Sequence, residues 1–263
     1  MKRSSGVRLC ATTAVGALSL ALVTGCGGDG SKDSAGTPAE GAGRPATKAL
    51  SAAELRKRVI TDGEVPGYKV GAVPAGRAQL IKADDAKCEP VARVMSGFAP
   101  VPGAARTDRM ATQEPRKTGG ARPTPQGDRG EGGFEASVNK AMTRDITTVD
   151  LSSYEGDGAA KALKAFADAV KGCAGGFVGK QAGTAMKFTR LTGGGAAGAG
   201  DESVAVTAVT DMDGGKTAPV YAVVVRHGNT LASYQTVNFG AMMSGKSYAV
   251  SPEVVEAQSA KLK

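Results

Sequence analysis

The sequence contains no tryptophan, few other aromatic residues and little excess charge. Aromatic residues make up 4% of its 263 residues, so Val, Leu, Ile, Ala and Met must supply most of the hydrophobic core. Three basic residues lie in the first eight positions, and the rest of the chain carries 30 Lys and Arg against 25 Asp and Glu. Nucleic-acid-binding proteins typically have clustered basic residues and stacking aromatics. The composition therefore argues against a nucleic-acid partner and suits a protein near anionic lipid headgroups or wall polymers.

The single histidine, His227, limits the catalytic and metal sites that the chain can form. A Ser-His-acid or Cys-His arrangement would have to use it, and no G-x-S-x-G motif accompanies it. One histidine and two distant cysteines do not form a zinc pattern. Asp211-Met-Asp213-Gly214 begins like a calcium loop, but Ala222 stands where the bidentate glutamate is required. We therefore predict no enzyme activity, no cofactor and no metal site.

No hydrophobic run in the N-terminal segment is long enough to span a bilayer. Residues 9–25 are uncharged and follow Lys2, Arg3 and Arg8, but the run is shorter than the roughly 20 apolar residues of a membrane helix. A basic head, a short apolar stretch and a small-residue cleavage site are typical of a secretory signal peptide.

Leu22-Val23-Thr24-Gly25-Cys26 ends this stretch and resembles the lipobox of bacterial lipoproteins. In that family the chain is cut just before the cysteine, which carries a thioether-linked diacylglycerol. The resemblance implies a signal peptide at 1–25 and lipidation of Cys26, with acyl chains such as palmitate holding the protein on the extracytoplasmic face of the cell membrane. The alternative is an ordinary secretory signal in which Cys26 is incidental.

Two cysteines remain once Cys10 is removed with the signal and Cys26 is acylated. Cys88 and Cys173 lie 85 positions apart, and disulfides persist in exported proteins. The chain-entropy model gives a bridge of this length about 4–5 kcal/mol of stabilisation. We predict a Cys88–Cys173 disulfide; the alternative is two buried free thiols.

The rest of the chain is predicted to form one α+β domain after a tether. Residues 26–47 are rich in Gly, Ser, Ala and Pro without apolar periodicity, which indicates a lipidated N-terminus followed by a flexible tether. The domain then covers 48–263. Ser51 and Glu54 form a capping box, and Ser251-Pro252 is a typical helix start. Helices are expected at 51–60, 85–96, 157–172 and 251–262.

Strand patterns dominate the last third of the sequence. We predict one or two strands within 134–154 and further strands at 184–191, 203–212, 217–227 and 230–239. The glycine-containing turns at 213–215 and 228–229 predict an antiparallel meander flanked by helices. Val220–Val225 is apolar on both faces and should be central. Residues 99–133 contain five prolines and alternating charges, which predicts a long exposed loop, with Arg106–Thr112 as a candidate short strand inside it.

Residues 240–247 satisfy the P-loop pattern G-x4-G-K-[ST] letter for letter. That motif works because it leads from a parallel strand into a helix whose first amides hold phosphate. Here Tyr248–Pro252 reads as extended chain, and the preceding strand belongs to an antiparallel hairpin. We predict a Gly/Ser-rich loop with an exposed Lys246 and no nucleotide.

Four short motifs together resemble the PknH-type extracellular sensor domain and its actinobacterial lipoprotein relatives. They are Leu151-Ser-Ser-Tyr154, Gly172-Cys173-Ala-Gly-Gly-Phe177, Gly200-Asp201-Glu202-Ser203 and Val223-Val-Val-Arg226-His-Gly-Asn229-Thr-Leu231. The resemblance spans residues 150–231, and the part before 134 matches less well. It implies a disulfide-bonded α+β domain with an antiparallel sheet and a cleft for a ligand or envelope component, without enzymatic activity.

The sequence thus predicts a membrane-anchored extracytoplasmic lipoprotein that acts as a non-catalytic ligand-binding or sensor-like module. Its expected partners are membrane lipid through acylated Cys26 and an envelope lipid, wall polymer or protein. The alternative is a structural or interaction protein of the envelope with no small ligand. A deep apolar cleft would favour the first hypothesis and a filled core the second, but no ligand-binding residue can be assigned.

Overall fold

The structure is a computed structural model that describes residues 47–115, 142–194, 199–212 and 215–263. The predicted signal peptide, Cys26, nearly all of the tether and residues 116–133 of the predicted loop lie outside the described residues. Within the described parts of the chain, no helix is long and apolar enough to cross a membrane.

A nine-stranded antiparallel sheet forms the centre of the fold, with the strands in the order β1-β3-β4-β9-β8-β7-β6-β5-β2. The strands are β1 (Tyr68–Gly71), β2 (Lys82–Ala83), β3 (Ala105–Gln113), β4 (Ile146–Ser153), β5 (Phe177–Gln181), β6 (Thr184–Gly194), β7 (Glu202–Met212), β8 (Lys216–His227) and β9 (Thr230–Val237). β8 lies near the middle of the sheet, as its apolar run predicts, because it pairs with both β7 and β9. The predicted α+β class and the antiparallel meander are confirmed.

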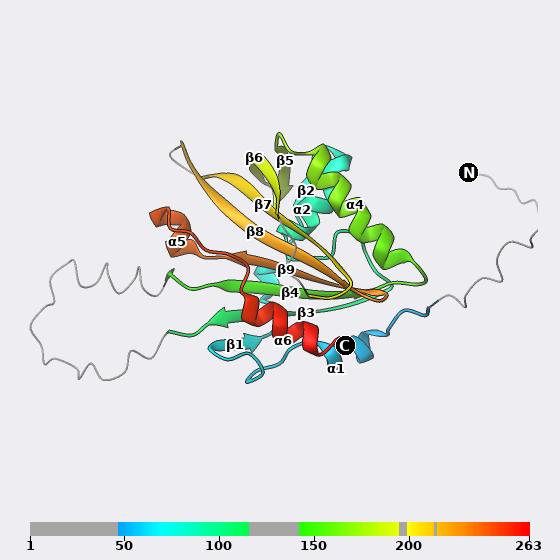
Figure 1. The fold of residues 1–263 in the computed structure, drawn as a ribbon. Coiled ribbons are helices and arrows are strands. Elements are labelled where there is room, and N and C mark those ends of the chain that lie inside the picture. Colours follow the sequence, from blue (N-terminus) through cyan, green and yellow to red (C-terminus); the bar gives the residue numbers. More distant parts are fainter. Residues whose placement is uncertain (1–46, 116–141, 195–198, 213–214) are drawn as a thin grey trace, which may run out of the picture. The chain divides into compact units, whose positions relative to one another are not determined.

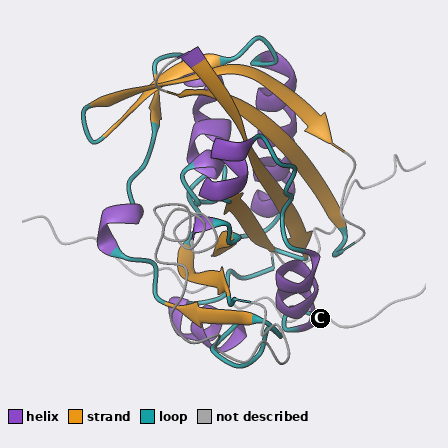
Figure 2. Cartoon of the chain, turned by 90° about the vertical axis from the view of Figure 1, so that its left-hand side faces the viewer, coloured by secondary structure: helices purple, strands orange, loops and turns teal. Residues whose placement is uncertain are grey.

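Helices cover both faces of this sheet (Figure 1). The α-helices are α1 (Ala52–Arg58), α2 (Glu89–Met95), α4 (Gly158–Gly172), α5 (Phe239–Ser244) and α6 (Pro252–Ala260), and two 3-10 turns are η1 (Ala75–Arg77) and η2 (Ala86–Cys88). α2 and α4 pack on one face, around Val91, Leu163 and Phe166. α1 and α6 pack on the other, around Leu55, Val59 and Val254. The twisted sheet therefore separates two hydrophobic cores (Figure 2).

Side chains of each strand alternate between these two cores, as the period of two in a strand requires. In β4, Val149 and Leu151 belong to the core under α1 and α6. Thr148 and Asp150 therefore point to the face that carries α2 and α4. This alternation places the candidate site described below on the α2/α4 face.

The helix ends that short sequence motifs predict are confirmed. Ser51 and Glu54 form the capping box of α1, with the Glu54 carboxylate accepting from the Ser51 amide at 2.8 Å. The Ser251 side chain caps α6, whose first residue is Pro252. The helix predicted at 157–172 is present as α4, which carries an apolar stripe and ends at Gly172, next to Cys173.

The prediction of a long exposed loop is wrong for residues 105–113, because these residues form β3. This strand pairs with β1 on one side and β4 on the other, so it is interior to the sheet. It is longer than the short strand considered at Arg106–Thr112. Only Ala111 of β3 is fully buried, so the strand carries almost no alternation of apolar and polar residues.

β5 and α5 are among the elements that the sequence did not predict. β5 is five residues long, with Phe177 stacked on Phe188 of β6 at a ring-centroid distance of 4.6 Å. Gly179 of β5 lies so close to its neighbour that an added Cβ would stand 2.8 Å from Ile81 Cγ2. α5 occupies residues 239–244, which had been expected to continue a strand and then form a loop.

Candidate functional site: an apolar cavity at one end of the sheet

A cavity of about 340 Å³ lies on the α2/α4 face of the sheet, at the end where β9 leads into α5. Its floor is formed by side chains from β4, β6, β7, β8 and β9. Its walls come from the end of α2, from the segment around η1 and from α5. The volume is at the lower end of the range for small-molecule sites, which is about 300–1,000 Å³.

The lining of the cavity is mainly apolar. Eight large hydrophobic side chains contribute to it, namely Ile81, Met95, Met186, Phe188, Val220, Val237, Phe239 and Met242. Several belong to the core or pack against it, so the cavity is continuous with the core under α2 and α4. Three methionines give this surface the flexible, polarisable side chains that adapt to ligands of irregular shape.

Several polar groups of the lining are already hydrogen-bonded within the protein. The Ser96 hydroxyl donates to Ala92 O at 2.7 Å, and the Thr210 hydroxyl donates to Lys187 O at 3.2 Å. The Gln181 side-chain amide donates to Gln79 O at 2.7 Å. These groups offer little polarity to a ligand, which strengthens the apolar character of the cavity.

Arg77 is the one titratable residue among the described residues that line the cavity. Its guanidinium lies 5.6 Å from the centre of the Phe239 ring, so a cation–π contact links η1 to α5 at the cavity wall. Phe239 is 38% exposed, and Met243 beside it is 62% exposed. This end of the molecule therefore presents apolar surface and one positive charge to solvent.

The predicted Cys88–Cys173 disulfide is present, and the alternative of two free thiols is excluded. It joins the end of η2 to the end of α4, with the two Cα atoms 6.0 Å apart. Both cysteines belong to the α2/α4 core. The bridge therefore fixes the two helices that cover the same face as the cavity.

His227 lies at the end of β8, at the opposite end of this strand from the cavity-lining Val220. Its Nε2 is buried and has no hydrogen-bond partner in the described part of the chain. Burial lowers its pKa; the Arg226 and Lys263 charges act in the same direction, and Asp201 opposes them. Among the described residues, no three His, Cys, Asp or Glu residues are grouped so that they could hold a metal.

The motifs around Asp201 and Asn229 hold the β8–β9 turn and the start of the domain together. The Asp201 carboxylate accepts from the Gly228 amide at 2.7 Å and from Arg226 Nη1 at 3.1 Å. The Asn229 side-chain amide donates to Lys48 O at 2.7 Å. Asp201 and its neighbour Glu202 therefore act as turn and strand-entry residues around Arg226.

The P-loop-like segment does not have the geometry of a P-loop. In that motif the helix begins at the Gly-Lys-Ser triplet, whereas here α5 ends at Ser244 and Gly245 follows in the left-handed conformation, with φ 66°. Lys246 is exposed, as predicted. The expectation of a Gly/Ser-rich loop is wrong for residues 239–244, because Asn238 caps a short helix there.

Sequence reasoning did not find the residues that line the cavity. One local signal could have helped, because Phe239 and Met242 are three positions apart and therefore lie on one face of a helix. The other lining residues come from segments between positions 76 and 237, and each looks like an ordinary core or strand residue in the sequence. Only the tertiary arrangement brings these residues together around one cavity.

Comparison with known proteins gives little further guidance. No family model matches the chain, and no curated protein is sufficiently similar in sequence. The structure has a weak similarity to the extracellular domain of PknH from Mycobacterium tuberculosis, with a TM-score of 0.47 and 11% sequence identity. The alignment covers 82% of this chain and 95% of that domain.

Proposed function

We propose that the protein is a non-catalytic, lipid-anchored extracytoplasmic module that binds an apolar or amphipathic ligand in the cavity beside α5. The observation that carries the proposal is the cavity itself, an apolar space of about 340 Å³ left between the sheet and its helices. Packed protein interiors contain few voids larger than a water molecule. A space of this size with an apolar lining is suited to a ligand that brings its own apolar surface.

The lining supports binding rather than catalysis. General acid–base or nucleophilic chemistry needs groups such as His, Asp, Glu, Cys or Lys in reach of the substrate. Of the titratable residue types, the described lining residues supply only Arg77. The cavity can hold a ligand and orient its charge, but it provides no group that would take up a proton.

The start of the domain supports an anchor at the end of the sheet opposite the cavity. The Gly156 amide donates to Thr47 O at 2.8 Å, and the Leu50 amide donates to Ser153 Oγ at 2.9 Å. These contacts lie beside the β8–β9 turn, whereas α5 lies at the other end of the strands (Figure 1). The described part of the domain therefore starts at the end of the sheet opposite the cavity.

Substitution of Val237 by phenylalanine tests the binding proposal. Val237 lines the cavity and is partly exposed, so the larger ring would fill the cavity from its surface side. The matched control is Val178→Phe, because Val178 is 40% exposed on β5 and does not line the cavity. The protein used is residues 27–263, exported behind an ordinary secretory signal, which keeps every described contact.

Envelope lipids with one acyl chain should raise the melting temperature of the wild type and of Val178→Phe, and should have little effect on Val237→Phe. The measurement is a thermal-shift titration without detergent. No shift in the wild type with any envelope lipid or wall fragment would contradict the proposal and favour a structural or interaction protein without a small ligand.

The lipid anchor is tested separately at Cys26. Wild-type protein should incorporate labelled palmitate and fractionate with the membrane, because two or more acyl chains anchor a protein stably. Cys26→Ala should do neither. A Cys26→Ala protein that still takes up the label would show that the lipobox resemblance is incidental.

A further inference from the structure

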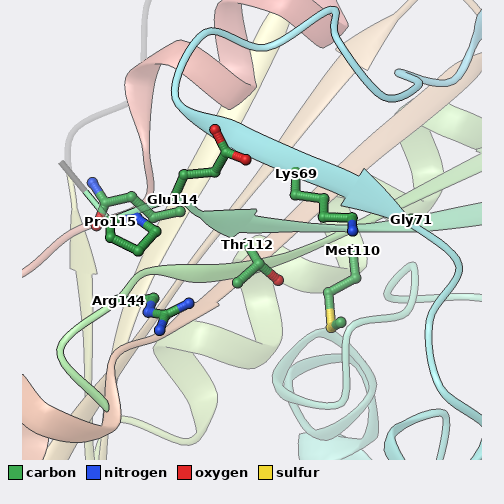
Figure 3. Close-up of a pocket in the computed structure, with 8 residues that line it drawn as sticks. Lys69, Gly71, Met110, Thr112, Glu114, Pro115 and Arg144 are labelled. Atoms are coloured by element: carbon green, nitrogen blue, oxygen red, sulfur yellow. The ribbon is translucent and has the colours of Figure 1, made fainter. Parts of the chain in front are cut away.

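A second hollow lies next to the cavity on the same face of the sheet. It has a volume of about 330 Å³ and is lined by residues of β1 and β3, by Glu114 and Pro115 after β3, and by Arg144, just before β4. Lys69 and Gly71 come from β1, and Met110 and Thr112 come from β3 (Figure 3). Tyr68 and Val70 point into the core under α1 and α6, so Lys69 points to the face that carries the cavity.

The strand register makes the two hollows direct neighbours. Thr148 of β4 lines the cavity, and its partner across the ladder is Met110, which lines the second hollow. Directly opposite side chains on one face of an antiparallel pair have Cβ atoms about 4.5–5.5 Å apart. The Thr148–Met110 pair therefore stands between the two hollows.

The neighbouring row of paired residues, which runs across the strands, leads from the apolar cavity to a positively charged side chain. It runs from Val237 through Ile146 and Thr112 to Lys69, one residue from each of four neighbouring strands. With strands about 4.8 Å apart, the backbone of Lys69 lies about 14 Å from that of Val237. A single-chain lipid could place its chain at one end of this row and its head at the other.

Lys69 and Arg144 form no ion pair with any described residue. Arg144 Nε is buried and has no hydrogen-bond partner in the described part of the chain. In Figure 3 the Arg144 guanidinium and the Thr112 side chain lie on one side of β3, while the Glu114 carboxylate points to the other side. Within the described residues, the second hollow thus combines Lys69 and Arg144, which form no ion pair, with the Glu114 carboxylate in its lining and a donor that lacks an acceptor.

We propose that the two hollows form one binding surface for an anionic amphiphile with a single acyl chain, the chain in the cavity and the anionic head at Lys69 and Arg144. The inference rests on the proposed function, because it assumes that the cavity takes the chain. Arginine and lysine bind phosphate and carboxylate through charge-assisted hydrogen bonds, which are about twice as strong as neutral ones. The head would supply the acceptor that Arg144 lacks.

Isothermal titration of residues 27–263 with three probes tests the proposal. The probes are lysophosphatidylglycerol, the monoacylglycerol with the same chain, and glycerol phosphate. The two lipids are used below the concentration at which they aggregate. Wild-type protein should bind the anionic lipid about tenfold or more tightly than the neutral one. Glycerol phosphate, which has the head without the chain, should show no measurable binding.

The double variant Lys69→Gln/Arg144→Gln should lose most of this preference and keep its affinity for monoacylglycerol within about twofold. Arg56→Gln/Lys57→Gln is the matched control, because it removes the same charge from exposed positions of α1 on the opposite face. It should retain the preference. Raising the salt concentration should weaken binding of the anionic lipid more than that of the neutral one.

The outcomes separate this inference from the proposed function. If Val237→Phe weakens the binding of both lipids but the double charge variant leaves both affinities unchanged, the cavity binds the chain and the proposal of an anionic head site is wrong. If Val237→Phe leaves the affinity for both lipids unchanged, the proposed function is wrong as well. Equal losses for both lipids in the double charge variant, or tight binding of glycerol phosphate by wild type, would also overturn the amphiphile proposal.

Discussion

Asp150 is a buried charge at the centre of the α2/α4 face. Its side chain has no exposed surface, and its carboxylate accepts from Arg106 Nε at 2.8 Å and from the Ser152 hydroxyl at 2.8 Å. Burial raises the pKa of Asp150, and the Arg106 charge opposes that rise. Arg106 also lies over the Phe98 ring, at 4.5 Å, and so links β3 and β4 to the loop after α2.

Arg106→Met should destabilise the protein by about 3 kcal/mol at neutral pH, because it leaves the Asp150 carboxylate buried with one neutral partner. Adding Asp150→Asn to this variant should recover most of the loss. Urea denaturation of both single variants and the double variant measures the coupling. Additive losses would show that the two side chains do not stabilise each other.

The loss in Arg106→Met should also depend on pH. Because the pKa of Asp150 is raised in the folded chain, its contribution to stability falls as pH rises from the ordinary value of 3.8 through the folded pKa. Removing Arg106 raises the folded pKa further. The destabilisation should therefore be smaller near pH 4 than at neutral pH.

His227 has the opposite sign of pH dependence from Asp150. Its pKa is lowered in the folded chain by burial, so the unfolded chain takes up the proton first as pH falls below the ordinary value of 6.5. Stability is therefore lost as pH falls from 6.5 towards the folded pKa. His227→Gln should reduce the loss of unfolding free energy between neutral pH and about pH 5; an unchanged slope in chemical denaturation would exclude His227 as its source.

At the scale of helices and strands, sequence predicts best the elements that have a local cause. The Ser51–Glu54 capping box and the Ser251-Pro252 start can be identified without any tertiary contact, and both are present in the structure. β5 depends on packing against its neighbours, since Gly179 must lie against Ile81. β3 depends on pairing with strands on both sides, because only Ala111 of its residues is fully buried.

The disulfide links helical elements to one another, because it ties η2 and α2 to the end of α4. Cys88→Ala/Cys173→Ala should lower the free energy of unfolding by about 4–5 kcal/mol, since the bridge closes a loop of 85 residues in the unfolded chain. Reduction of the wild type should give a similar loss in a denaturation experiment. A loss below about 1 kcal/mol would show that packing of α2 against α4 is sufficient without the bridge.

At the scale of the whole molecule, the sheet assembles a site that no single segment contains. The cavity needs Arg77 and Ile81 from the start of the domain, Thr148 from β4 and Phe239 from α5. The first and the last of them, Arg77 and Phe239, are 162 positions apart, and none belongs to a recognisable motif. The argument against a catalytic triad or a zinc site could be made from composition, whereas the position of the candidate site required the fold.

The two ends of the sheet have different roles in this account. Hydrogen bonds from the strand ends hold Thr47 and Lys48 where the tether joins the domain. The cavity and the hollow beside it lie on one face of the sheet, and α5 lies at the end of the strands opposite the β8–β9 turn (Figure 1).

Native mass spectrometry of the exported chain tests the central claim most directly. Wild-type protein and Val178→Phe, released without detergent, should each carry one single-chain lipid per molecule, and Val237→Phe should carry none. Collisional release of that lipid would identify its head group. Wild-type protein without bound lipid, which also fails to take up added lysophosphatidylglycerol or monoacylglycerol, would contradict the account.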